Sequence, residues 1–242
     1  MKILICGKGG SGKSTISALI AKSLAGKGYD VLVIDGDESN LSLYRLLGVN
    51  QPKEFIEHFG GRKKLKSAMK KSGLFERPLK IEEVGDYVSE KGRVKFLTIG
   101  KIREFGDGCA CPIGTLLREF LKCLKFDGFV IVDTDAGIEH FGRAVAEGCD
   151  LIIYVIDPTF ESIALIGSVE DMAKKAGKDV FFILNKVDDD IKEVMLNQID
   201  TDRLLAVIPV RREIFESCLK GEELNPIPEI EDVAEFLIGS KR

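Results

Sequence analysis

The chain has no apolar run long enough to cross a membrane, no large excess of charge of one sign, and no repeated or low-complexity segment. A membrane-spanning helix needs about 18 or more apolar residues, and a signal peptide needs a charged region followed by an apolar one. Neither pattern occurs, so we expect a soluble, cytoplasmic protein without membrane contact. The net charge of −4 provides no general attraction to nucleic acid, which we do not expect as a partner unless a local basic patch supplies it.

Cysteine is also scarce, with six residues in 242. Cysteines of a cytosolic protein are normally reduced, so a closely spaced pair indicates metal binding or redox chemistry in preference to a disulfide. Hydrophobic residues make up 45% of the chain and charged residues 31%, which suits a folded domain with a substantial core. We predict a single domain over residues 1–242.

Strand-like and helix-like segments alternate along most of the chain, which predicts an α/β fold with a mostly parallel, twisted sheet of about seven strands and helices on both faces. Apolar runs rich in β-branched residues predict strands at Lys2–Cys6, Val31–Ile34, Val94–Ile99, Phe129–Val132, Leu151–Ile156, Val180–Leu184 and Leu204–Ile208. Helical spacing occurs at Ser14–Lys27, Ile113–Lys125, Glu161–Lys175 and Arg211–Leu219. Ligands of such sheets bind beyond the carboxyl ends of the strands.

A basic segment interrupts this alternation. Residues Gly60–Leu74 contain no acidic residue and six basic ones: Arg62, Lys63, Lys64, Lys66, Lys70 and Lys71. We predict a helical insertion around residues 53–78. Two interpretations remain open, a solvated helix face and a patch for nucleic acid or an acidic partner.

Residues Gly7–Ser14 match the phosphate-loop pattern G-x-x-x-x-G-K-[ST], with a predicted strand before it and a predicted helix after it. Glycines let successive backbone N–H groups curl around phosphate oxygens at the helix N-terminus. Lys13 is predicted to neutralise the β- and γ-phosphates, and the Ser14 hydroxyl to ligate Mg²⁺. The residues predicted to contact ATP or ADP here are Gly9, Gly10, Ser11, Gly12, Lys13, Ser14 and Thr15.

Three aspartates follow predicted strands. Asp133 is predicted to hold Mg²⁺, and Asp35 to support the same metal shell. We predict that Asp37 orients the water that attacks the γ-phosphate. Helix capping is the alternative for each of these acids.

Two further strand ends are predicted to meet the nucleotide base. Asn185, in "NKVD", carries an amide that both donates and accepts and therefore suits an adenine edge. The segment is similar to the NKxD base-reading motif, and Asp188 leaves the identity of the base open. Pro209 and Val210 are predicted to lie alongside the base and to offer backbone groups.

The segments "KGGSGKS", "DGDESN" and "DTDAGIEHFGR" resemble those of the deviant Walker A ATPases, which include MinD, ParA and the nitrogenase iron protein. The resemblance implies a P-loop NTPase fold and a homodimer that encloses ATP between its subunits. It also implies that the extra lysine, Lys8 here, reaches the phosphates bound by the partner and assists catalysis together with Lys13 and Asp37. Without the resemblance, Lys8 reads equally well as a solvent-facing loop lysine.

Within that family the chain is most similar to the CooC-type ATPases, through "DGDESN" at residues 35–40, "GCACP" at 108–112 and "DTDAGIEHFGR" at 133–143. This resemblance implies nickel insertion into a carbon monoxide dehydrogenase-type apoenzyme. Asp135 departs from the wider family, where proline is common, and the roles of Asp135 and His140 stay open.

Cys109 and Cys111 form a Cys-x-Cys pair, which is half of a tetrahedral four-cysteine set. A two-fold dimer brings the same patch of both subunits together, so we predict an inter-subunit site for Ni²⁺ or Zn²⁺, whose identity the spacing leaves open. The alternative is two reduced cysteines in a turn. The remaining cysteines are predicted to be ordinary buried thiols: Cys6, Cys123, Cys149 and Cys218.

These features predict a homodimerising, Mg²⁺-dependent ATPase that couples nucleotide turnover to metal binding and delivery. Two alternatives remain. One is an iron–sulfur cluster carrier or electron-transfer ATPase, which the thiolates also suit. The other is a positioning ATPase of the MinD or ParA kind, although the acidic C-terminal segment Glu229–Arg242 does not suit a lipid anchor.

Overall fold

A computed structural model describes residues 1–69, 74–101, 111–135 and 143–241, with the side chains of residues 111, 143 and 144 left aside. Its strands are β1 (Lys2–Gly7), β2 (Val31–Asp35), β3 (Leu79–Lys80), β4 (Val88–Lys91), β5 (Val94–Thr98), β6 (Leu124–Lys125), β7 (Phe129–Asp133), β8 (Leu151–Ile156), β9 (Asp179–Asn185) and β10 (Leu204–Ile208). The α-helices are α1 (Lys13–Gly26), α2 (Leu43–Leu47), α3 (Arg62–Met69), α4 (Cys111–Cys123), α5 (Arg143–Ala146), α6 (Phe160–Ala164), α7 (Ile166–Ala176), α8 (Asp189–Leu196), α9 (Arg212–Lys220) and α10 (Pro228–Ser240). Short 3₁₀ helices are η1 (Phe55–Phe59), η2 (Ile81–Tyr87) and η4 (Thr201–Arg203).

The central sheet has eight strands in the order β10-β9-β8-β1-β7-β2-β5-β4. All neighbouring strands run parallel except β4, which pairs antiparallel with β5 at the edge. The predicted α/β architecture is confirmed, with eight strands in place of about seven. The strand that the sequence did not reveal is β4, whose residues Val-Ser-Glu-Lys are half-buried or exposed and therefore form no apolar run.

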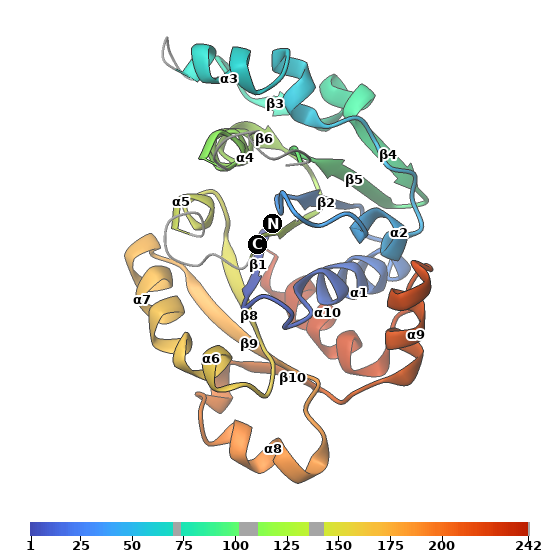
Figure 1. The fold of residues 1–242 in the computed structure, drawn as a ribbon, viewed down its shortest axis with the longest axis vertical. Helices are drawn as coiled ribbons and strands as arrows, with labels where there is room; N and C mark the ends of the chain where they lie inside the picture. The colour runs from blue at the N-terminus through green and yellow to red at the C-terminus, as the bar shows by residue number, and fades with distance from the viewer. Residues whose placement is uncertain (70–73, 102–110, 136–142, 242) are drawn as a thin grey trace.

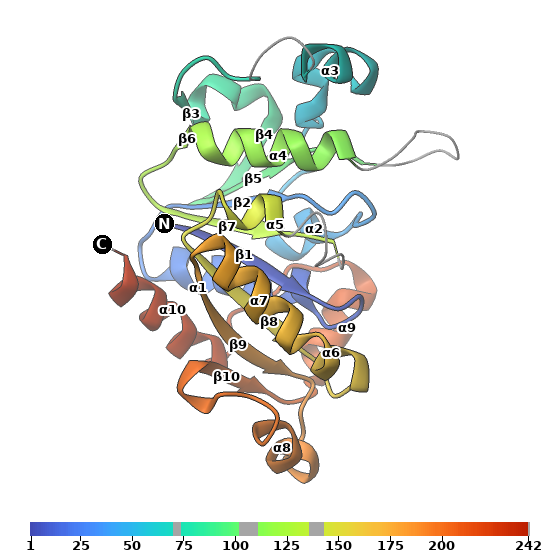
Figure 2. The ribbon, with the colours of Figure 1, turned by 90° about the vertical axis from the view of Figure 1, so that its left-hand side faces the viewer.

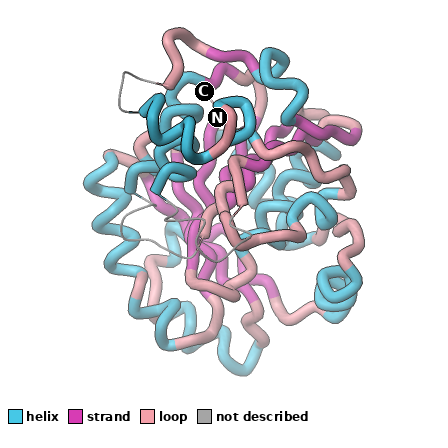
Figure 3. The backbone as a smooth tube through the Cα atoms, turned by 45° about the horizontal axis from the view of Figure 1, so that its top comes forward, coloured by secondary structure: helices cyan, strands magenta, loops and turns pink. Residues whose placement is uncertain are grey.

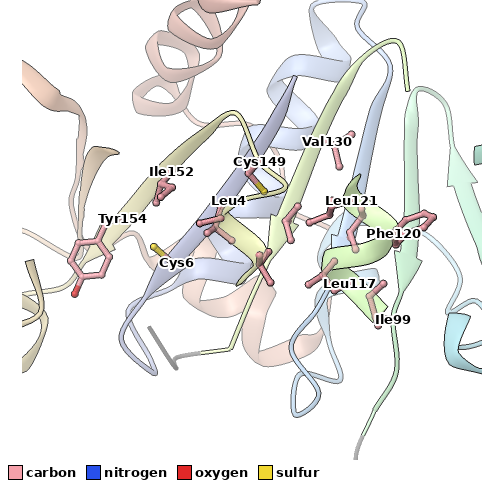
Figure 4. Packing of buried hydrophobic residues seen from close by; sticks show 14 of the residues in the cluster. Leu4, Cys6, Ile99, Leu117, Phe120, Leu121, Val130, Cys149, Ile152 and Tyr154 are labelled. Atoms are coloured by element: carbon pink, nitrogen blue, oxygen red, sulfur yellow. The ribbon is translucent and has the colours of Figure 1, made fainter. Parts of the chain in front are cut away.

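Helices cover both faces of the sheet (Figures 1 and 3). Successive residues of β1 enter opposite layers, because side chains alternate along a strand: Leu4 packs with α4 and α7, and Ile3 with α1 and α10. Figure 4 shows the first layer, in which Leu4 and Val130 of the sheet lie with Leu117 and Leu121 of α4. Both faces of the central strands are consequently buried, which explains their continuous apolar runs.

The predicted helices differ from the observed ones mainly at their ends. Residues 161–175 form two helices, α6 and α7, instead of one. The helix predicted over residues 113–125 is α4, which ends at Cys123, and Leu124 and Lys125 form β6 beside β3. α10 was not among the predicted helices.

The region predicted as a helical insertion contains η1 and α3. In two perpendicular views α3 lies over α4 (Figures 1 and 2), with Leu65 buried in the same apolar layer as Phe55 and Phe120. The lysines of the basic segment that the structure describes, Lys63, Lys64 and Lys66, are exposed. Lys70 and Lys71 lie outside the described residues. Among the described helices, none has both the length and the apolar character required to span a bilayer.

Candidate nucleotide site

The phosphate-loop segment connects the carboxyl end of β1 to the first residue of α1 at the centre of the sheet. The chain leaves β1 toward β2 on one side, while β8, β9 and β10 extend the sheet on the other, so the loop lies at a topological switch point. Gly10 and Gly12 adopt positive φ angles of 83° and 99°. These angles suit glycine because a Cβ atom there meets steric strain.

Asn185, at the end of β9, is hydrogen-bonded to this loop. Its Nδ2 donates a 2.7 Å hydrogen bond to the carbonyl oxygen of Ser11. A Cβ atom on Gly12 would lie 2.3 Å from the same nitrogen. The Asn185 side chain therefore packs directly under the loop, which is a shaping role in addition to the base contact that the sequence predicted.

A cavity of about 730 Å³ opens above the loop. It is lined by most of the residues predicted to contact nucleotide: Gly9, Gly10, Gly12, Lys13, Ser14, Thr15, Asp37, Asn185, Pro209 and Val210. Ser11 does not line it, and the Ser11 hydroxyl is buried with no hydrogen-bond partner among the described residues. The sequence did not predict the apolar wall, which comes from α1, α2 and α9: Ile16, Leu19, Leu46, Ile214 and Phe215.

Val210, which lines the cavity and was predicted to lie beside the base, is joined to Asp188. The backbone N–H of Val210 donates a 3.1 Å hydrogen bond to Asp188 Oδ1. Pro209 has no N–H group. The carbonyl oxygens are therefore the polar backbone groups that this segment can direct toward a base.

The two lysines of the phosphate loop occupy different environments. Lys13 lines the cavity, is 7% exposed, and its Nζ donates a 3.2 Å hydrogen bond to the carbonyl oxygen of Lys8. Lys8 is not among the lining residues, and its Nζ lies 3.0 Å from Glu161 Oε2 of α6. The Lys8 ammonium is thus directed toward α6 and not into the cavity that Lys13 lines.

Ser14 and Asp133, the predicted Mg²⁺ ligands, are in direct contact. Ser14 Oγ donates a 2.6 Å hydrogen bond to Asp133 Oδ2, and Ser17 Oγ donates a 3.1 Å bond to Oδ1. Burial raises the pKa of Asp133 to about 6, while the Ser14 hydrogen bond and the Lys13 charge oppose the rise. These oxygen ligands beside a phosphate position fit Mg²⁺, which would neutralise charge on the β- and γ-phosphates.

Asn40 completes this cluster and was missed by the sequence prediction. Its Nδ2 donates a 2.8 Å hydrogen bond to Ser14 Oγ. An amide in a polar loop has no distinctive sequence signal. Only the fold brings it next to Ser14, which lies 26 positions away.

Asp37, which was predicted to orient the attacking water, lines the cavity. Its Oδ1 accepts hydrogen bonds from the N–H and hydroxyl of Ser39, at 2.8 and 2.7 Å, and from the N–H of Asn40 at 3.1 Å. The same carboxylate therefore shapes the turn that follows β2. It does not cap the next helix, α2, whose N-cap residue is Ser42.

Asp35 is paired in register with Asp133 on the neighbouring strand, but its carboxylate binds a different donor. It is buried, does not line the cavity, and its Oδ2 accepts a 2.6 Å hydrogen bond from Lys101 Nζ. Burial raises the pKa of the Asp35 carboxyl, and the adjacent Lys101 ammonium opposes that rise. The structure thus pairs Asp35 with a buried lysine that the sequence analysis did not single out.

The Cys-x-Cys pair is described only in part. Cys109 and His140 lie outside the described residues, and Cys111 is the first residue of α4. Within the described part of the chain, no three His, Cys, Asp or Glu side chains form a candidate metal cluster. Cys6 and Cys149 are buried, and burial raises the pKa of both thiols to about 12. Cys123 and Cys218 are half-buried, and Cys218 lines the nucleotide cavity.

A glycine-rich loop between β1 and α1, with Lys13 and Ser14 lining one cavity and Asp133 hydrogen-bonded to Ser14 behind it, defines a P-loop NTPase. The chain belongs to the CobQ/CobB/MinD/ParA nucleotide-binding domain family, whose model matches residues 2–224. It is accordingly an ATP-binding NTPase domain, in agreement with the predicted ATPase class.

Individual relatives are similar over most of the chain. An ATP-binding protein of Methanocaldococcus jannaschii is 56% identical, covering 98% of this chain and 99% of that protein. The carbon monoxide dehydrogenase accessory protein CooC of Rhodospirillum rubrum is 32% identical, covering 92% and 87%. Among solved structures, the septum site-determining protein MinD of Pyrococcus horikoshii with Mg-ADP covers 100% of this chain and 98% of its own, with a TM-score of 0.73 and 23% identity. The similarity to this MinD structure shows a shared fold.

Proposed function

We propose that the protein is a homodimerising, Mg²⁺-dependent ATPase that uses ATP turnover to bind and deliver a metal, and that its reaction is nickel insertion into a carbon monoxide dehydrogenase-type apoenzyme. The similarity to the CooC accessory protein over 92% of this chain supports the client class. The Cys-x-Cys pair supports a soft metal as cargo.

The position of Lys8 is the observation that carries the dimeric mechanism. The Lys8 side chain is 27% exposed and is paired with the 72% exposed side chain of Glu161, outside the cavity that Lys13 occupies. An ammonium on the side of the loop that faces away from the cavity is placed to act on phosphates in a facing subunit. A cation supplied in trans stabilises the transition state only when the dimer is closed.

Other residues of this chain bind the phosphates, hold Mg²⁺ and orient the attacking water. The loop backbone and Lys13 hold the phosphates, and Ser14 with Asp133 would hold Mg²⁺, which supplies charge neutralisation at the phosphates. Asp37 orients the attacking water. ATP binding and metal binding both favour the closed dimer in this scheme, so each ligand strengthens the binding of the other.

Metal content tests the cargo site. Equilibrium dialysis of the purified protein against Ni²⁺ is expected to give about one ion per two chains, since two protomers complete a four-thiolate set. The double variant C109A/C111A is expected to lose this ion while its affinity for ADP stays unchanged. Cys123→Ala, at the other end of α4, is the matched control and is expected to retain the metal.

Two outcomes contradict the proposal. Nickel retained by C109A/C111A places the metal elsewhere. A reducible absorbance band in the visible after anaerobic reconstitution with iron and sulfide, together with no nickel uptake, favours an iron–sulfur cluster carrier.

A further inference from the structure

Lys101, three residues beyond the last residue of β5, places a buried ammonium beside the turn that carries Asp37. The Lys101 side chain is 2% exposed and that of Asp35 is 3% exposed, with 2.6 Å between Nζ and Asp35 Oδ2. The same Nζ also donates to the main-chain carbonyl oxygen of Asp37. One ammonium therefore joins the side chain at the end of β2 to the main chain two residues later.

The main chain of Lys101 is itself held on both sides. Its N–H donates a 2.9 Å hydrogen bond to Glu54 Oε2, and its carbonyl oxygen accepts a 2.7 Å bond from Arg62 Nη2 of α3. Glu54 and Arg62 flank η1, whose Ile56 N–H donates to Ile99 O at 2.9 Å. The base of the lysine side chain is thus fixed by the segment inserted after β2.

The turn at Gly36 is confined from the opposite side. Its N–H donates a 2.8 Å hydrogen bond to the carbonyl oxygen of Asp133, and a Cβ atom at Gly36 would lie 2.6 Å from Leu117 Cδ2 of α4. The N–H of Asp37 donates to Asp35 Oδ1 at 3.2 Å. Asp35 accordingly links the Asp37 N–H and the Lys101 ammonium, while Lys101 binds the Asp37 carbonyl.

A buried lysine is a costly way to fill this space. Burying an ammonium and a carboxylate costs several kcal/mol of solvation each, and an apolar pair of similar volume is often at least as stable. Stability alone therefore gives little reason for a lysine here. A group that donates to a backbone carbonyl from a fixed position provides what an apolar side chain cannot, which is a defined orientation of the peptide at Asp37.

We propose that Lys101 is a positioning residue for ATP hydrolysis: its ammonium, anchored on Asp35, fixes the main chain at Asp37 so that the Asp37 carboxylate stays directed into the nucleotide cavity. The inference rests on the role proposed above for Asp37. Lys101, which follows β5, would thus support hydrolysis without lining the cavity.

Steady-state ATPase kinetics of Lys101→Met test this role. A displacement of about 1 Å at a catalytic group can lower turnover by about a hundredfold, so we expect a loss of that order in kcat. Affinity for a fluorescent ADP analogue is expected to stay within about twofold, because the phosphate loop is unchanged. Lys95→Met is the matched control: it removes a lysine of β5 that pairs with Glu90 near the surface, and its kcat is expected to match that of the parent.

The double variant D35N/K101M separates positioning from charge balance. Lys101→Met leaves the Asp35 carboxylate buried without its partner and lowers the melting temperature, whereas the double variant removes both charges and recovers it. We expect kcat of the double variant to remain low, because no ammonium donates to the Asp37 carbonyl. Recovery of kcat together with stability would overturn the inference, as would a parental kcat in Lys101→Met.

Asp37→Asn distinguishes failure of the inference from failure of its premise. A low kcat in Asp37→Asn beside a parental kcat in Lys101→Met overturns the inference alone. A parental kcat in Asp37→Asn overturns the proposed role of Asp37 and the inference with it.

Discussion

At Gly12 the main chain passes within contact distance of the Asn185 amide, and a single methyl group would not fit between them. The phosphate-loop pattern requires this glycine for a reason that only the fold displays. A residue 173 positions away, at the end of β9, fills the space below it. The sequence motif and the contact with Asn185 therefore both require glycine at position 12.

Gly12→Ala tests this constraint. The positive φ of 99° and the 2.3 Å approach to Asn185 Nδ2 are expected to cost about 1–3 kcal/mol of stability and to weaken ADP binding at least about tenfold. Chemical denaturation and nucleotide titration measure the two effects.

The control for that variant is Gly26→Ala, at the exposed end of α1 with open space around its Cβ position. It is expected to stabilise the protein by about 0.4–1 kcal/mol, because alanine has less freedom to lose on folding. Parental ADP affinity in Gly12→Ala would show that the loop tolerates the methyl group.

Among the elements, α10 shows how a segment without a functional motif supports the site. Its buried residues Ile230, Val233 and Leu237 pack against α1 and β10. Glu231 of α10 accepts a hydrogen bond from the Ser23 hydroxyl and pairs with Lys27 at the end of α1. The helix that begins at Lys13 is therefore held on its outer side by the C-terminal segment.

Leu237→Ala is expected to lower the free energy of unfolding by about 2–5 kcal/mol, because Leu237 is fully buried and truncation leaves a cavity. Urea unfolding measures the loss. Leu219→Ala makes the same change at a position that is 76% exposed and is expected to shift stability by no more than about 0.5 kcal/mol. Similar losses in both variants would contradict the packing of α10 described above.

At the scale of the whole molecule, the phosphate loop lies where the two halves of the sheet diverge, and Lys8 projects from it toward α6. Lys8→Ala is expected to bind ADP with parental affinity and to lose hydrolysis by a factor on the order of a thousand, the scale of a cation supplied in trans. Light scattering with a non-hydrolysable ATP analogue is expected to detect a dimer for the parent and a monomer for the variant.

Lys175→Ala, an exposed lysine near the end of α7, serves as the control and is expected to hydrolyse ATP and dimerise like the parent. A monomeric parent under every nucleotide condition would refute the dimeric mechanism. Unchanged hydrolysis in Lys8→Ala would instead leave Lys8 as an ordinary loop lysine.

The sequence by itself determined the features that depend on short segments. The seven predicted strands appeared as apolar runs, because both faces of a central strand contact the core and even the half-buried residues of the edge strand β10 pack against it. Gly7–Ser14 predicted the phosphate loop, since glycine spacing and one lysine are local requirements. Asp133 and Asn185 were expected near this loop because strand ends meet at one edge of a parallel sheet, and the structure places them against Ser14 and Ser11.

Tertiary structure alone decided the features that depend on contacts between residues far apart in the sequence. The residues of the edge strand β4 are half-buried or exposed, so they form no apolar run that would predict a strand. Asp35 follows a strand just as Asp133 does, yet Asp35 pairs with Lys101 and Asp133 with Ser14, because each carboxylate binds the donor that the fold brings to it. Long-range pairing of this kind depends on sheet order and helix packing, which no local pattern of residues encodes.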